Sequence, residues 1–275
     1  MKLYTHKDEN FVSNMDMSSE ELDEMANMFY DAYDAKKDKA YQFLDKANEA
    51  LNDSEAIKYI KKALNVYPEC FEAKIMLAAY EDNPLKVLNM IEEAVNTERK
   101  VLSAEGLLSN NVKLIDEIQI LPFIHGLYNL AYLYAGSGMI NKALEVAKET
   151  LKYDNDGTTE VRELLMALYA YREDGNNLNK IYKKYNEDNL DSLIPFLVYY
   201  FKQGNYSKAR EYLDKIMKYN KHFKCIFDEI SPDDLIGDAK PHEKLEVKHA
   251  GANLAFLLDT VPALEIFVKN NGKIE

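Results

Sequence analysis

The stretch KYDNDGTTEVRE, residues 152–163, is the clearest imitation of a chemical site in this chain, because it has the spacing of a calcium-binding loop. Asp154 and Asp156 stand two residues apart at ligand positions, and Glu163 stands at the distance of the closing carboxylate. The first ligand position, however, is Lys152, and a cation where the loop needs a carboxylate should abolish binding. We therefore predict a turn here, with no metal site.

The remaining reactive residue types form no catalytic pattern. His242 and His249 are seven residues apart, which is not the four-residue spacing of a zinc-binding helix. Cys70 follows Pro68 and Glu69 at a repeat junction, and Cys225 lies in an apolar patch; both are predicted to be small core side chains, and no nucleophile-base pair is suggested. The glycines of 136–138 follow a predicted helix and not a strand, so they do not form a phosphate loop. We predict a protein that is not an enzyme, with no catalytic residue and no cofactor.

Composition and charge indicate the fold class and exclude some partners. The chain has 275 residues, of which 47% are hydrophobic, and only 10 Gly and 7 Pro, which favours helices joined by short turns. We predict an all-α protein. The formal net charge of −13 disfavours nucleic acid and anionic membranes, because both draw affinity from clustered Lys and Arg. An apolar or basic protein or peptide segment is the expected partner.

Several features predict a cytoplasmic location. Two cysteines so far apart in sequence are expected to be reduced. The first residues, MKLYTHKDENFVSNMDM, lack the apolar core of a signal peptide, and no apolar run is long enough to cross a bilayer. The sequence leaves a homo-oligomer open.

Two helical hairpins 66 residues apart share one pattern and indicate a repeat protein. Residues 192–220 hold two apolar helical stripes joined by a turn at Gly204, and an equivalent hairpin precedes them at 123–153. In both hairpins four residues follow one another at intervals of three, four and five positions. They are Leu197, Tyr200, Gly204 and Ala209 in the later hairpin, and Ala131, Tyr134, Gly138 and Ala143 in the earlier one. A third, degenerate hairpin is predicted between them, in which Leu168 and Tyr171 lead to Gly175 and Lys180 stands near the position of the Ala.

The organisation predicted from these patterns has three parts. Residues 1–17 form a flexible arm, and residues 18–221 form about five helical repeats. An irregular insertion near 96–121 interrupts the repeats and ends at Pro122, which is predicted to open a helix. Residues 222–275 form helices that cap the last repeat, because a stack of repeats must cover its final apolar face.

The hairpins resemble tetratricopeptide (TPR) repeats, in a divergent, bacterial-type form. The family signature is Leu beside Gly or Ala, then Tyr, Gly, Ala, a later Ala-Leu pair and a Pro. Two groups of residues resemble it along most of its length, and a third matches its second half. These are Leu130, Ala131, Tyr134, Gly138, Ala143 and Leu151; Phe196, Leu197, Tyr200, Gly204 and Ala209; and Ala56, Ala63, Leu64 and Pro68. The resemblance implies an α-solenoid, a right-handed superhelix of stacked antiparallel hairpins whose concave groove holds a peptide or a partner's helix.

Placing the matched helices in register predicts the residues of this groove. It is expected to be aromatic and apolar, and its side chains with polar tips suit contacts to a protein partner. The predicted ligand-binding residues are His125, Tyr128, Asn129, Tyr132, Leu165, Tyr169, Val198 and Phe201.

The leading hypothesis is a non-enzymatic scaffold that binds a protein or peptide in the concave face. An alternative is a peptide-sensing regulator that signals through its end helices. The N-terminal sequence shows no DNA-binding helix-turn-helix motif, so such a regulator is expected to act through another protein. An enzyme of unknown reaction is a further alternative, which a convergence of His125, Glu160 and Arg162 would favour.

Overall fold

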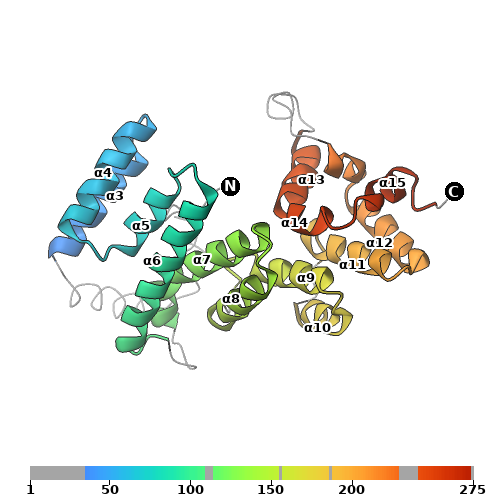
Figure 1. The fold of residues 1–275 in the computed structure, drawn as a ribbon, viewed down its shortest axis with the longest axis horizontal. Coiled ribbons are helices and arrows are strands. Elements are labelled where there is room, and N and C mark those ends of the chain that lie inside the picture. Colours follow the sequence, from blue (N-terminus) through green and yellow to red (C-terminus); the bar gives the residue numbers. More distant parts are fainter. Residues whose placement is uncertain (1–34, 109–113, 155–156, 186–187, 229–240, 274–275) are drawn as a thin grey trace, which may run out of the picture. The chain divides into compact units, whose positions relative to one another are not determined.

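The computed structural model describes residues 35–108, 114–154, 157–185, 188–228 and 241–273, and all regular structure in these ranges is helical (Figure 1). The predicted all-α class is confirmed. The chain divides into two compact units, Met1–Leu130 and Ala131–Glu275, and the division falls inside helix α7 (Leu114–Gly136). The arm predicted at 1–17 lies outside the described residues. Within the described ranges, no helix is both long and apolar enough to span a membrane.

The first unit begins with helices that pack through small side chains. These helices are α3 (Ala35–Asn48), α4 (Asp53–Val66) and α5 (Phe71–Ala78). Their shared core joins alanines to a few larger groups: Ala40, Leu44, Ala47, Ile60, Ala63, Cys70, Ala73 and Met76. Alanine at these positions lets the helix backbones approach closely. The N-cap of α4 is Asn52, whose side chain accepts from the Glu55 N–H at 3.0 Å.

Helices α6 (Pro84–Ala104) and α7 replace much of the predicted insertion. The Asn83 side chain caps α6, and the helix continues to Ala104, where the sequence suggests an irregular segment. Helix α7 begins at Leu114 and contains Pro122, so this proline lies within a helix and does not open one. Gly126 allows α7 to pack on α5, because a Cβ at this position would overlap the Phe71 ring.

In the second unit, three hairpin turns share one hydrogen-bonding pattern. They connect α7 to α8 (Ile140–Tyr153), α9 (Val161–Tyr171) to α10 (Gly175–Tyr185), and α11 (Leu190–Lys202) to α12 (Tyr206–Tyr219). Each turn has a residue with a left-handed backbone: Gly138 (φ 74°), Glu173 (φ 59°) and Gly204 (φ 66°). The next residue then donates to the carbonyl five residues back, on Tyr134, Tyr169 and Tyr200, at 2.8, 2.9 and 2.9 Å. These tyrosines are therefore equivalent.

This pattern corrects the register of the middle hairpin by two residues. The equivalent of Ala143 and Ala209 is the fully buried Leu178, and the turn residue is Glu173 in place of the predicted Gly175. Gly175 instead opens α10, where a Cβ would overlap the Tyr199 hydroxyl. Position 175 therefore requires glycine for close packing. Glu173 adopts the left-handed backbone conformation in which glycine is usually found.

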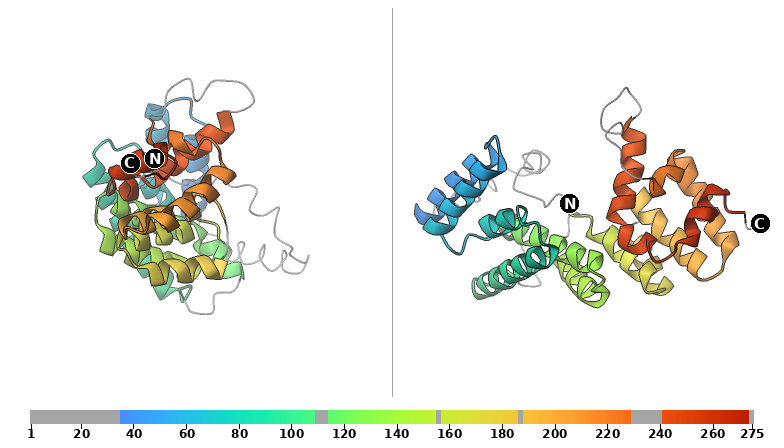
Figure 2. Two further views of the ribbon diagram at one scale, coloured as in Figure 1. Left: turned by 90° about the vertical axis from the view of Figure 1, so that its right-hand side faces the viewer. Right: turned by 45° about the horizontal axis from the view of Figure 1, so that its top comes forward.

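The C-terminal helices lie against the middle of the second unit. After the 3₁₀ turn η1 (Phe223–Phe227), the described chain continues with α13 (Pro241–Asn253), α14 (Ala255–Leu258) and α15 (Ala263–Lys269). Helix α13 contacts η1 and α11, and α14 contacts both α9 and α11. Figure 2 shows these orange-to-red helices beside the yellow α9 and α11. They therefore cover earlier hairpins in addition to the end of the last one.

Candidate binding face

The C-terminal helices rest on three aromatic side chains of the second unit, which we call the aromatic face: Tyr132 of α7, Tyr171 of α9 and Phe201 of α11. The Tyr132 hydroxyl donates to the Ala252 carbonyl at 3.2 Å. The Tyr171 ring stacks on Phe256 with centroids 6.4 Å apart, and the Phe201 ring meets Phe267 edge-on at 5.2 Å. Three successive hairpins therefore contact the C-terminal helices through one hydrogen bond and two ring contacts.

Tyr171 is also contacted by α11. Lys202 Nζ donates to the Tyr171 carbonyl at 2.6 Å and lies 5.4 Å from the centre of its ring. The same ammonium forms an ion pair with Glu173 at 3.4 Å. The ring is thus fixed in place for stacking on Phe256.

The eight predicted groove residues are divided between the two units. His125, Tyr128 and Asn129 belong to the first unit, where Tyr128 and Asn129 are buried and His125 is half-buried. The Asn129 amide nitrogen has no hydrogen-bond partner among the described residues. The structure therefore does not define one site that contains all eight residues.

Of the five predicted residues in the second unit, two lie on the aromatic face and three are covered. Tyr132 and Phe201 contact the C-terminal helices, as described above. Leu165 and Val198 are 0% exposed, and Tyr169 is buried with Lys148 Nζ 5.8 Å from its ring centre. Their burial follows from the packing of α9 and α11, which have hairpin neighbours on some sides and the C-terminal helices on another.

Tyr171 was missed by sequence reasoning because of the two-residue register error. In the predicted register Tyr171 is equivalent to Tyr134, the tyrosine before the hairpin turn. In the corrected register Tyr169 is the equivalent of Tyr134. The sequence contains a signal for the corrected register: Tyr169 directly follows Leu168 and can take the place of Tyr134, although it is predicted as a groove residue.

Four carboxylates of the second unit form a group that interacts through charge. It comprises Glu160 and Glu163 at the start of α9, Asp191 at the start of α11 and Glu246 of α13. Burial, and then the negative charges of Glu160, Glu163 and Glu246, raise the pKa of Asp191 to about 7. Burial and the charges of Asp191 and Glu160 likewise raise the pKa of Tyr132 to about 12. In the described part of the chain, these acids do not form a group suited to hold a metal ion.

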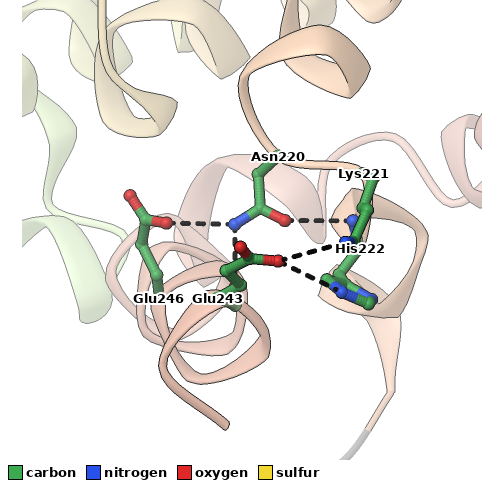
Figure 3. Close-up of polar contacts among 5 residues, drawn as sticks. All are labelled: Asn220, Lys221, His222, Glu243 and Glu246. Atoms are coloured by element: carbon green, nitrogen blue, oxygen red, sulfur yellow. Dashed lines mark hydrogen bonds and ion pairs between the residues drawn. The ribbon is translucent and has the colours of Figure 1, made fainter. Parts of the chain in front are cut away.

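The first turns of α13 are fastened to the end of α12 by a polar network that we call the latch: Asn220, Lys221, His222, Glu243 and Glu246 (Figure 3). The buried Asn220 amide donates to the Glu243 carbonyl at 2.8 Å and to Glu246 Oε2 at 3.0 Å, and its oxygen accepts from the His222 N–H at 3.0 Å. Glu243 Oε2 lies 3.7 Å from Lys221 Nζ and 3.4 Å from His222 Nε2. The imidazole contact is an ion pair only when His222 is protonated.

The other candidate sites have structural explanations. The Asp154 carboxylate accepts from the backbone N–H and the hydroxyl of both Thr158 and Thr159, at 2.6–3.1 Å, and so organises the turn before α9. The Arg162 guanidinium lies 4.1 Å from the centre of the Tyr185 ring. His249 is exposed, while the His242 side chain lies outside the described residues. Cys70 and Cys225 are both free.

Comparison with known proteins gives no match: no model of a protein family fits this chain, and no curated protein is significantly similar to it.

Proposed function

We propose that this chain is a non-enzymatic binding protein of the TPR type, whose aromatic face holds a helical segment of a partner protein. The observation that carries this proposal is the contact of three aromatic side chains with the C-terminal helices: Tyr132 of α7 with α13, Tyr171 of α9 with α14, and Phe201 of α11 with α15. A surface that accommodates one helix of this shape has the contacts needed for another.

The chemistry of the aromatic face supports a protein partner. Tyrosine and phenylalanine bring large contact areas at a low cost in side-chain entropy, and they are enriched where binding energy concentrates. The three equivalent turns at Gly138, Glu173 and Gly204 set α7, α9 and α11 in a repeated arrangement, which supports the arrangement as a solenoid of hairpins.

Charge favours a basic segment. The charges of Glu160 and Asp191 act on Tyr132 of the aromatic face, that of Glu163 acts on Asp191, and the whole chain has a formal charge of −13. A cationic side chain from a partner would lower the electrostatic free energy of this cluster, while an acidic one would raise it.

The test is selection of helical peptides from a displayed library on the full chain, followed by affinity measurement on variants. We expect Tyr171→Ala and Phe201→Ala each to weaken the selected peptides about 10-fold or more, as for central aromatic contacts elsewhere. Tyr80→Ala, which removes an exposed tyrosine of the first unit, is the matched control and should leave affinity unchanged. If no peptide is selected, or if both face variants bind like the wild type, the proposal is wrong.

A peptide-sensing regulator is the second candidate function. It is favoured by the direct contact of the C-terminal helices with the aromatic face, since a ligand on this face would have to move them. In that case, peptide binding should change hydrogen exchange in α13–α15 as well as in α9 and α11.

A further inference from the structure

Helices α10 and α12 carry positive charge in a chain that is negative overall. Together they hold seven Lys or Arg side chains and two acids, Glu211 and Asp214, which gives +5 against −13 for the whole chain. The seventh cation, Arg210, donates to the Gly272 carbonyl at 2.7 Å. The other six are exposed lysines, which we call the basic face: Lys180, Lys183, Lys184, Lys208, Lys215 and Lys218.

Four aromatic rings connect the two helices across α11. The Phe196 ring of α11 stacks on Tyr212 of α12 with centroids 4.8 Å apart, and it meets Tyr182 of α10 edge-on at 5.1 Å. The Tyr200 ring of α11 stacks on Tyr212 at 5.5 Å. Phe196 is fully buried, whereas the three tyrosines are half-buried and keep part of their surface toward solvent. Helices α10 and α12 are thus joined at one aromatic cluster.

Two lysines of the basic face lie against this aromatic cluster. Lys208 Nζ is 5.0 Å from the centre of the Tyr200 ring, and Lys215 Nζ is 4.8 Å from the centre of the Tyr212 ring. Burial is the main cause that raises the pKa of Tyr212 to about 12, so its hydroxyl keeps its proton and can donate to a carboxylate. Positive charge, apolar ring surface and a hydroxyl donor therefore occur together.

The basic face differs from the aromatic face in position and in charge. Figure 1 shows α10 below α9 and α11, and α13 and α14 above them. The acids on or beside the basic face are Glu211, Asp214 and Asp188, and the Asp188 carboxylate accepts from the Tyr182 hydroxyl. Six exposed lysines outnumber these three acids, so the face suits a segment of negative charge.

The chain itself contains such a segment. Residues 8–34, DENFVSNMDMSSEELDEMANMFYDAYD, include nine acids and no Lys or Arg, so their formal charge is −9. Leu22, Met25 and Phe29 stand among these acids at intervals of three and four. The segment lies outside the described residues and ends directly before α3. It offers carboxylates for the lysines and apolar side chains for the aromatic cluster.

We propose that the basic face binds residues 8–34 of a second copy of this chain, so that the protein self-associates through opposite charges. Each copy supplies both a segment and a face, and the contact joins different surfaces of the two copies. Charge complementarity brings the copies together, and contact with the rings of Tyr200 and Tyr212 adds apolar burial. Because salt screens exposed charges, the association should weaken as ionic strength rises.

The first experiment titrates a fluorescent peptide of residues 8–34 with the full chain, at chain concentrations too low for self-association, and measures anisotropy. We expect the face variant K208E/K215E to bind the peptide at least about 10-fold more weakly than the wild type. K58E/K61E is the matched control, because it reverses two exposed lysines of α4 and gives the same net charge. Its affinity should change by about 2-fold or less. Equal affinity of the two variants, or no binding to the wild type, would overturn the proposal.

The second experiment tests whether the contact joins two copies. The segment variant E20K/E21K/D23K/E24K keeps the basic face and reverses four acids. In analytical ultracentrifugation at low salt, we expect the wild type to self-associate and the face variant and the segment variant each to be monomeric. An equimolar mixture of the two variants should form a 1:1 complex, since the intact segment of one can bind the intact face of the other. A monomeric wild type or a monomeric mixture would overturn the proposal, including the case in which the segment binds its own chain.

A single-stranded oligonucleotide separates this occupant from another polyanion, because lysines beside aromatic rings also suit phosphates and bases. We expect a poly-uridine probe of about 20 nucleotides to bind the wild type at least about 10-fold more weakly than the peptide does, given the negative charge of the chain. A probe that binds as tightly as the peptide and is lost in the face variant would overturn the choice of occupant. None of these variants touches the aromatic face, so the proposed function is tested separately.

Discussion

Asp191→Asn should stabilise the second unit at neutral and alkaline pH. The folded chain raises the pKa of Asp191 from 3.8 to about 7, so it keeps the proton through a range in which the unfolded chain has lost it. Stability from this group is therefore greatest below pH 4 and declines as the pH rises to 7. Asparagine resembles the protonated acid in shape and carries no charge, so it should remove this decline.

The size of the effect follows from the difference in pKa. At about 1.4 kcal/mol for each pH unit, a rise from 3.8 to about 7 corresponds to roughly 4 kcal/mol. This is an upper bound, because Asp191 is only half-buried and the carboxylate can relax toward water. We expect the variant to gain about 2 kcal/mol over the wild type between pH 5 and pH 7.

The assay is native-state hydrogen exchange of α11 and α13, expressed as protection factors so that the intrinsic dependence of exchange on pH is removed. Asp214→Asn is the matched control, because Asp214 is an exposed carboxylate on the adjoining helix α12. Its protection factors should follow those of the wild type at each pH. An Asp191→Asn chain with the same pH dependence as the wild type, or with lower protection at pH 8, would refute the reasoning.

Three further predictions concern the turns and the latch. Glu173→Gly should stabilise the second unit by about 0.5 kcal/mol in urea unfolding, since relief of a left-handed backbone worth about 1–2 kcal/mol outweighs the partly exposed ion pair with Lys202 and the hydrogen bond from Gln203. Gly175→Ala should destabilise it by about 1–3 kcal/mol, and Tyr199→Ala in the same chain should recover part of the loss in a double-mutant cycle. Asn220→Ala should cost about 2 kcal/mol and speed hydrogen exchange in the first turns of α13, with little change in α9.

The sequence predicts the helices well because their apolar stripes and turns are local features. The hairpins around Gly138 and Gly204 have the predicted turn geometry, since a glycine there permits the left-handed residue. The middle hairpin misled the same reasoning: Glu173 takes that conformation without being glycine, and Gly175 is required by the approach of Tyr199. A glycine in the sequence does not reveal whether it is required for a left-handed backbone or for close packing against a neighbouring side chain.

The aromatic face was harder to predict than the helices. Position in a repeat indicates which side of a helix a residue occupies, and on this basis the sequence predicts Tyr132 and Phe201 as residues of a concave groove. It does not indicate what else packs there, and Leu165 and Val198 are buried because helices distant in sequence pack around α9 and α11. Such contacts depend on tertiary packing, which the periodicity of one segment does not encode.

Glu246 connects the titration of Asp191 with the docking of the C-terminal helices, because it belongs to both the latch and the carboxylate cluster. When Asp191 is protonated, one of the charges that repel Glu246 is removed, so α13 should dock more tightly as the pH falls through 7. Acid should therefore favour the docked arrangement of α13, which would appear as higher protection factors in α13 below pH 7 than above it.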